Sequence, residues 1–270
     1  MSEGTASLAG VRLKIERAEK HFRDLVDARE RFLKSRPYEV VIQDNAETGR
    51  REWIAYARRP VPPEIALITG DAVHNLRSAL DHLIRQLLIA NRKDPEEYPR
   101  SAFPVWRSEA DYEAGRPGDA EGISKPALDI LDRLKPYKGG NDALWRLRQL
   151  DVVDKHRLLL AVGSANTNLI IDSRKLMIST HPGHDWLKKG PGVRAAYKAA
   201  EPTVITKEGA IFRTAPLGHE PEDYVEFPLD VALNEPTVGK PEPLVPAIHE
   251  LVRFTDEIVG LFEPLILESI

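Results

Sequence analysis

The sequence predicts a mainly α fold: a helical bundle that carries an inserted β-hairpin and a small antiparallel sheet (α+β). Three long segments repeat apolar residues every three or four positions, the spacing of one face of an α-helix. Two β-rich stretches lie between them. Because no helix can bury its apolar stripe alone, the three must pack together. We expect a single domain over residues 1–270, with β insertions at about 38–58 and 158–232.

The first third of the chain predicts helix, hairpin and helix in that order. Residues 5–35 repeat apolar side chains at helical spacing, and Pro37 ends this helix. The segment YEVVIQDNAETGRREWIAYARR has two β-rich runs around a polar turn that contains glycine, which predicts the hairpin at 38–58. A rigid RPVPPE linker then leads into a second long helix over about 63–92.

The rest of the chain mixes short helices and strands before a last long helix. Residues 93–121 are rich in Pro, Gly and charge, so we expect irregular structure there. An amphipathic helix is predicted over 123–136, and another begins at the Asn or Asp cap of NDALWRLRQLDVVDKHRLLL. Alternating residues predict strands after this helix and over 200–232. The last helix covers about 243–267.

Composition excludes several classes of function. The 270 residues carry a formal net charge of −4, which gives no global electrostatic reason to bind nucleic acid or anionic membranes. The chain has no cysteine, which excludes disulfides, thiolate chemistry and cysteine-based zinc sites. The sequence shows neither an apolar core of signal-peptide length near its start nor a run of about 18 apolar residues. We therefore expect a cytoplasmic protein with no membrane partner.

The stretch DAVHNLRSALDHL, residues 71–83, is the first candidate site. On a helical wheel His74, Ser78 and Asp81 point in similar directions, and Arg77 lies one turn from Asp81. The polar face also holds Asp71, Asn75, His82 and Arg85, and no lysine or glutamate occurs from residue 71 to residue 92. Short, stiff polar side chains of this kind suit a preorganised site. A surface ion pair within a structural hydrogen-bond network explains the same residues.

A second polar cluster lies in LDVVDKHRLLL. It contains Asp151, Asp154, Lys155, His156 and Arg157, directly before an apolar run. If this segment packs beside the second long helix, His156 and Arg157 complete the same site. The alternative is a charged helix end, where basic side chains favour the negative end of the helix dipole.

The remaining histidines predict no chemistry. His181 and His184 belong to the loop HPGH, and His21, His219 and His249 are isolated in the sequence. A lone loop histidine is ordinarily solvated.

The segment Arg77-Ser-Ala-Leu-Asp-His82 resembles the HEPN superfamily, whose motif is Arg followed four to six residues later by His. The resemblance covers residues 74–83 and the predicted helices around them. It implies a helical bundle that dimerises, so that two motifs meet, and an activity in RNA binding or metal-independent RNA cleavage. Many members are endoribonucleases of toxin–antitoxin and phage-defence systems, so RNA, a second copy and an antitoxin are the implied partners, with no cofactor.

This resemblance assigns a role to each polar residue. His82 would be the acid or base, Arg77 the phosphate ligand, Asp81 the group that orients Arg77, and His74 the second acid or base. The assigned substrate-binding residues are Asn75, Ser78, Lys155, His156 and Arg157. The chain departs from the family where Ser78 follows the arginine, since Asn, Asp or His is common there. On a straight helix Arg77 and His82 lie about 140° apart, which favours a site across a dimer axis.

Two alternatives stay open at the level of the sequence. His74, His82 and His156 would make a metal site that loosely resembles DinB-type four-helix metalloproteins, although His74 and His82 lie about 12 Å apart along the helix. The third interpretation has no catalysis: the polar face fixes the helix register or binds a partner chain. Glycine-rich phosphate loops and the Gly-x-Ser-x-Gly elbow are absent from the sequence. Whether the protein is an enzyme is left open.

Overall fold

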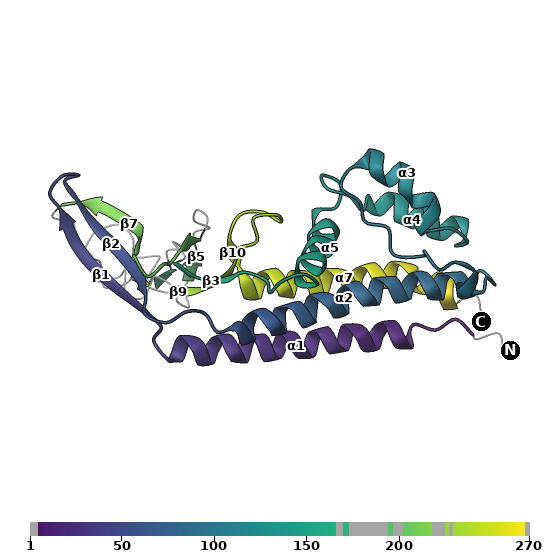
Figure 1. The fold of residues 1–270 in the computed structure, drawn as a ribbon, viewed down its shortest axis with the longest axis horizontal. Coiled ribbons are helices and arrows are strands. Elements are labelled where there is room, and N and C mark those ends of the chain that lie inside the picture. The colour runs from purple at the N-terminus through teal and green to yellow at the C-terminus, as the bar shows by residue number, and fades with distance from the viewer. Residues whose placement is uncertain are drawn as a thin grey trace, which may run out of the picture. The chain divides into compact units, whose positions relative to one another are not determined.

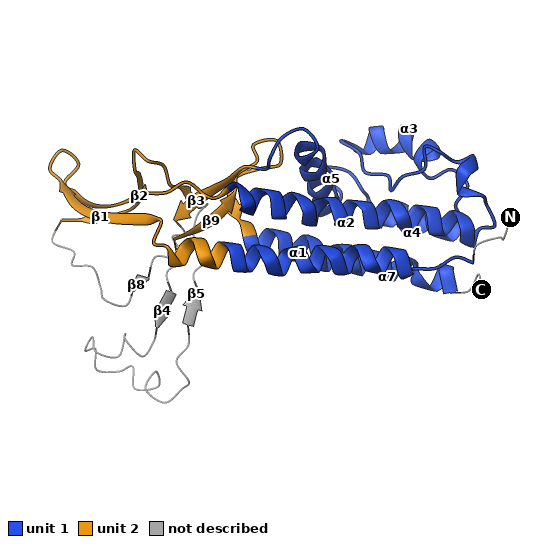
Figure 2. Cartoon of the chain, turned by 60° about the horizontal axis from the view of Figure 1, so that its bottom comes forward, with its two compact units in different colours: residues 1–28, 63–159, 245–270 blue, residues 29–62, 160–244 orange. Residues whose placement is uncertain are grey.

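The chain divides into two compact units in the computed structural model (Figure 2). Unit 1 comprises residues 1–28, 63–159 and 245–270, and unit 2 comprises residues 29–62 and 160–244. The structure describes residues 5–165, 170–172, 194–196, 202–217, 225–226 and 229–267. The prediction that the chain is a single domain stays a prediction.

Unit 1 is helical, and three of its helices are long (Figure 1). Its elements are α2 (Pro63–Ala90), η1 (Pro95–Glu97), α3 (Glu109–Asp119), α4 (Lys125–Leu134) and α5 (Asp142–Asp154), together with most of α1 (Ala9–Lys34) and α7 (Leu244–Leu267). Arg12 of α1 forms ion pairs with Asp256 and Glu263 of α7. Further along, the ring of Phe22 stacks on His249 with centroids 5.2 Å apart. The predicted long helices are therefore confirmed to within a few residues.

α2 forms where the sequence predicts it and separates an apolar from a polar face. Pro63 occupies its first turn, where the fixed φ of proline fits and a missing N–H costs no hydrogen bond. Leu76, Leu80, Leu83 and Leu87 are buried, at 0–2 % exposure. The polar residues of the candidate site lie on the other side of the helix, where they remain open to side chains from α5 and from the segment before α3.

The prediction of irregular structure over 93–121 is wrong in part, because α3 forms there. The Ser108 side chain accepts a hydrogen bond from the Asp111 N–H and so caps the first turn. Gly115 lowers the helix propensity, yet packing requires it: a Cβ there would lie 2.0 Å from the Trp106 indole. Tyr112 is buried and donates to Asp132 of α4 at 2.8 Å. Tertiary packing thus overrides a poor local helix signal.

The described residues of unit 2 form three antiparallel sheets. The first has the order β1 (Tyr38–Asn45), β2 (Arg50–Ala57), β7 (Ala210–Pro216); the second β10 (Glu242–Pro243), β9 (Leu229–Leu233), β3 (Ala161–Ala165), β6 (Thr203–Val204); the third β5 (Arg194–Ala196), β4 (Ile170–Asp172), β8 (Val225–Glu226). Its core cluster consists of Trp53, Ala55, Ala165, Ile205, Phe212 and Ala215. Arg29 holds Asp230 through two hydrogen bonds of 2.5 and 2.7 Å.

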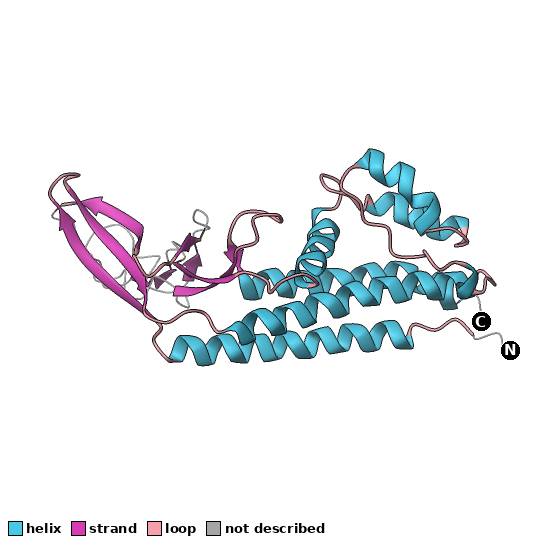
Figure 3. Ribbon diagram, in the orientation of Figure 1, coloured by secondary structure: helices cyan, strands magenta, loops and turns pink. Residues whose placement is uncertain are grey.

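The prediction of a mainly α fold is wrong, because the chain is a mixed α+β protein (Figure 3). The predicted hairpin exists, with Gly49 in its turn at φ +64°, but it is not an isolated insertion. Its second strand pairs with β7, placing Ile54 opposite Ile211. Pairing over such a separation leaves no local pattern in the sequence, so the sheet content was underestimated. Within the described residues, no helix has the length and apolar character needed to cross a membrane.

The buried face of α2 leads to a test of the fold. We expect Leu80→Ala to lower the free energy of unfolding by about 2–5 kcal/mol, because it removes a fully buried side chain and leaves a cavity. Leu67→Ala on the same helix, where the side chain is 53 % exposed, should change it by less than about 0.5 kcal/mol. Urea unfolding followed by far-ultraviolet circular dichroism measures both, and equal losses would contradict this packing.

Candidate functional site

The candidate site is built where α5 lies across α2 (Figure 1). α5 begins after Asn141, whose side chain accepts a hydrogen bond from the Leu144 N–H. Near its other end Asp154 packs over Gly70, where an added Cβ would lie 2.0 Å from the carboxylate oxygen. One turn earlier Asp151 contacts His74. Where they touch, the two helices therefore run in opposite chain directions.

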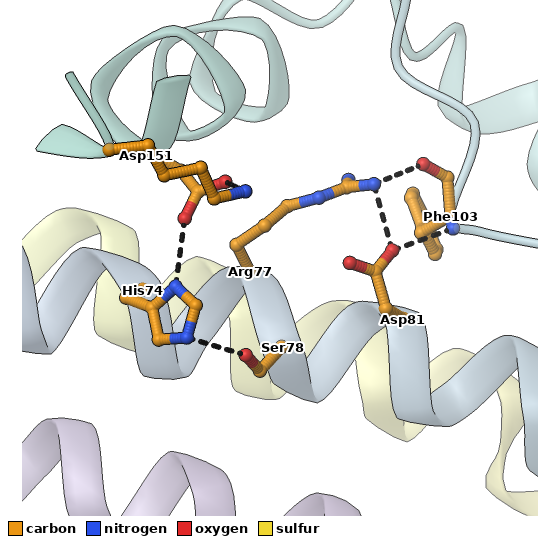
Figure 4. A network of polar contacts seen from close by, with 7 residues as sticks. His74, Arg77, Ser78, Asp81, Phe103 and Asp151 are labelled. Atoms are coloured by element: carbon orange, nitrogen blue, oxygen red, sulfur yellow. Dashed lines mark hydrogen bonds and ion pairs between the residues drawn. The ribbon is translucent and has the colours of Figure 1, made fainter. Parts of the chain in front are cut away.

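Asp151 is the centre of the first group of contacts (Figure 4). Its side chain is only 3 % exposed, and one carboxylate oxygen lies 3.1 Å from His74 Nδ1. The other oxygen accepts from Lys155 Nζ at 2.6 Å. A carboxylate removed from water requires such partners, since an unpaired buried charge is costly. The sequence predicted Lys155 as a substrate ligand, whereas here it contacts Asp151.

The His74 ring contacts Asp151 through Nδ1, and its other nitrogen, Nε2, is accessible to a ligand. The Asp151 carboxylate, paired with Lys155, can only accept, so Nδ1 of His74 carries the proton in the neutral ring. Nε2 is then an acceptor, and Ser78 Oγ lies 3.5 Å from it, at the outer limit of a hydrogen bond. The His74 side chain is 53 % exposed, so solvent and a ligand can reach it.

Arg77 and Asp81 form a second group of contacts that ties α2 to the segment before α3 (Figure 4). Arg77 Nη2 donates to Asp81 at 2.8 Å and to the Phe103 carbonyl oxygen at 2.8 Å. The same Asp81 oxygen accepts from the Phe103 N–H at 2.9 Å. Asp81 thus orients Arg77, and both also hold the backbone of a buried phenylalanine. This pair has a structural role beside any functional one.

The other predicted site residues lie apart from this centre. His82 is exposed, its Nδ1 lies 4.0 Å from where a Cβ on Gly10 of α1 would be, and it makes no hydrogen bond within the described residues. Asn75 donates to the Asp71 carbonyl oxygen at 2.8 Å. His156 and Arg157 follow the end of α5 and are exposed, with Arg157 donating to the Leu158 carbonyl oxygen. Arg77 and His82 therefore point to different neighbours, as their spacing predicts.

The proposed metal ligands do not converge in the described residues. No group of three or more His, Asp or Glu side chains suited to a metal ion occurs there. His74 contacts Asp151, His82 lies beside α1, and His156 follows α5. His181, His184 and His219 lie outside the described residues.

The pKa values of two side chains near Asp151, those of Asp154 and Arg148, are shifted. Burial raises the pKa of the Asp154 carboxyl, and the nearby charges of Asp71 and Asp151 act in the same direction. Burial lowers the pKa of Arg148, and the charges of Arg77 and Arg107 lower it further. No motif in the sequence singles out Arg148. The signal available was its position one turn before Asp151, on the same face of the helix.

The geometry supports acid–base chemistry at His74 more than nucleophilic catalysis. Ser78, His74 and Asp151 follow the order of a Ser-His-Asp relay. Ser78 is inside α2, however, so its own N–H and those of its neighbours are used by the helix and cannot stabilise an oxyanion. A histidine held by a carboxylate beside arginines instead fits proton transfer near a phosphate.

Comparison of the chain with protein-family models, curated proteins and solved structures found no match. The resemblances to the HEPN superfamily and to DinB-type metalloproteins therefore stay predictions.

The Asp81 contacts lead to a stability test. Asp81→Ala should lower the free energy of unfolding by about 1–3 kcal/mol, because it leaves the Phe103 N–H and the Arg77 guanidinium short of an acceptor. His82→Ala, one residue along the helix, should change it by less than about 0.5 kcal/mol. Chemical denaturation of both variants checks this. An unchanged Asp81→Ala protein would show that the contact with Phe103 does not hold α2 to this segment.

Asp154 leads to a pH test. Because its folded pKa lies above the unfolded value, stability is highest below the unfolded pKa and falls as pH rises to the folded pKa. Asp154→Asn removes that ionisation, so its melting temperature should exceed the wild-type value at pH 7. The gain should disappear as pH falls towards about 4, where the unfolded carboxyl is protonated. Melting curves over this range measure it, and a variant less stable at pH 7 would contradict the burial argument.

Proposed function

We propose that the protein is a metal-independent endoribonuclease in which His74 is the general acid or base. The observation that carries the proposal is the imidazole of His74, held by the buried Asp151 at Nδ1 and accessible at Nε2. Arg77 lies one turn along the same helix and supplies a cation that matches phosphate geometry. A 2′-hydroxyl is the group that such a histidine can deprotonate near neutral pH.

The reaction needs one proton removed and one supplied. His74 Nε2 takes the proton of the 2′-hydroxyl as its oxygen attacks phosphorus and forms a 2′,3′-cyclic phosphate. The bond to the 5′-oxygen breaks, and that oxygen takes a proton from water. Asp151 stabilises the imidazolium that forms, and the Arg77 guanidinium balances the negative charge on the phosphorane. No metal ion is required in this sequence of steps.

The proposal shifts the main acid–base role from His82 to His74. In the HEPN-like interpretation His82 works with Arg77 across a homodimer, which needs a second copy of the chain. His74 needs no second copy, because its orienting carboxylate comes from α5 of the same chain. The homodimer, a cytoplasmic location and an antitoxin partner belong to this proposal as expectations.

The test compares His74→Asn with His82→Asn on single-stranded RNA in EDTA. The amide introduced by His74→Asn keeps a donor for Asp151 but has no titratable nitrogen, so fold and charge partner are preserved. We expect cleavage to fall at least about a hundredfold in His74→Asn and by no more than a few-fold in His82→Asn. The cyclic phosphate at the product end is detected by mass spectrometry.

The alternatives have distinct outcomes in the same assay. Loss of cleavage in His82→Asn alone would assign the chemistry to the Arg77–His82 pair of the HEPN-like interpretation. Absence of cleavage by the wild-type protein would contradict the endoribonuclease proposal. Loss in Ser78→Ala equal to that in His74→Asn would point to a serine nucleophile.

A further inference from the structure

The guanidinium of Arg77 is only partly used by the protein. Its side chain is 12 % exposed, and Nη2 makes both contacts, to Asp81 and to the Phe103 carbonyl oxygen. Nη1 is buried and has no hydrogen-bond partner in the part of the chain that the structure describes. A buried donor without a partner is costly, so an unpaired Arg77 donor indicates a missing acceptor.

The helix register places a second guanidinium opposite Arg77. Asp154 lies against Gly70 and Asp151 against His74, so the next step of the same register sets Arg148 against Arg77. Arg148 is half-buried and makes no hydrogen bond or ion pair among the described residues. Its lowered pKa agrees with this placement, since the charge of Arg77 is among the causes.

A third arginine adds to the positive charge. Arg107 follows by four residues Phe103, whose carbonyl oxygen accepts from Arg77, and its charge acts on Arg148. It is exposed and has no hydrogen bond within the described ranges. The acidic side chains that act on this group are Asp81, which Arg77 engages, Asp119, whose pKa is raised by burial, and Asp151, which is paired with Lys155. Three guanidinium groups and Lys155 against three carboxylates leave one net positive charge. Arg77 Nη1, Arg148 and Arg107 have no hydrogen-bond acceptor among the described residues.

We propose that Arg77, Arg148 and Arg107 form a binding site for the phosphate group of a ligand. A tetrahedral oxyanion has several acceptors and a negative charge, and arginine donors fit it in bidentate geometry. It supplies the acceptor that Arg77 Nη1 lacks and separates like charges that otherwise repel. The site lies one helical turn from His74, so the inference deepens the proposed function when the phosphate belongs to RNA. Binding of a phosphate does not itself depend on RNA cleavage.

The test is calorimetric titration of the full chain with inorganic phosphate. We expect saturable binding that weakens by about tenfold or more in Arg148→Gln and in Arg107→Gln. Arg133→Gln, an exposed arginine in the last turn of α4, is the matched control and should bind as the wild type does. Arg107→Gln changes an exposed side chain, so it keeps the test informative if Arg148→Gln is poorly folded.

The outcomes separate this inference from the proposed function. No saturable binding, or equal weakening in Arg133→Gln, would overturn the phosphate site. Displacement of bound phosphate by a single-stranded RNA assigns the site to a nucleic-acid phosphate, whereas phosphate retained in excess RNA assigns it to a free or small-molecule phosphate. Phosphate binding without RNA cleavage keeps the site and rejects the endoribonuclease, and RNA cleavage without saturable phosphate binding keeps the endoribonuclease and rejects the site.

Discussion

The burial of one carboxylate determines most of what the site can do. Asp151 is almost removed from water, so it requires partners for both oxygens, and it finds them in His74 and Lys155. Meeting that requirement brings α5 against α2 in one register. Gly70 permits the close approach one turn away, where Asp154 packs over it. In the proposed phosphate site the same register sets Arg148 opposite Arg77, so the acid–base and the cationic groups would both follow from one contact.

The two groups of contacts on α2 differ in kind. Asp81 and Nη2 of Arg77 are engaged with each other and with the backbone of Phe103, and these contacts hold a segment in place. His74 has a close protein partner at Nδ1 only, and the rest of its side chain remains exposed. An imidazole with one fixed and one free ring nitrogen is suited to proton transfer, whereas an ion pair that also binds the backbone of another segment is suited to structure. This difference explains why His74 carries the proposed chemistry.

Local patterns predicted the helices and the hairpin, and they failed where distant residues decide. The apolar spacing of Leu76, Leu80 and Leu83 was sufficient to identify α2 and its polar face. The pairing of β2 with β7 and the helix around Gly115 depend on packing partners far along the chain or on a single indole. Within the site, the stripe on α2 was predictable from its periodicity. The partner of His74 was not, because nothing in the sequence states which face of α5 meets α2.

The most direct measurement of the central claim is the tautomer of His74, read from the ¹⁵N shifts of its two ring nitrogens in the intact protein. The contact with Asp151 predicts a proton fixed on Nδ1 and a non-protonated Nε2 in the neutral ring, with His82 showing the tautomer mixture of a solvated histidine. A neutral His74 protonated at Nε2, or a mixture equal to that of His82, would contradict it. Either result would mean that Asp151 does not orient this imidazole.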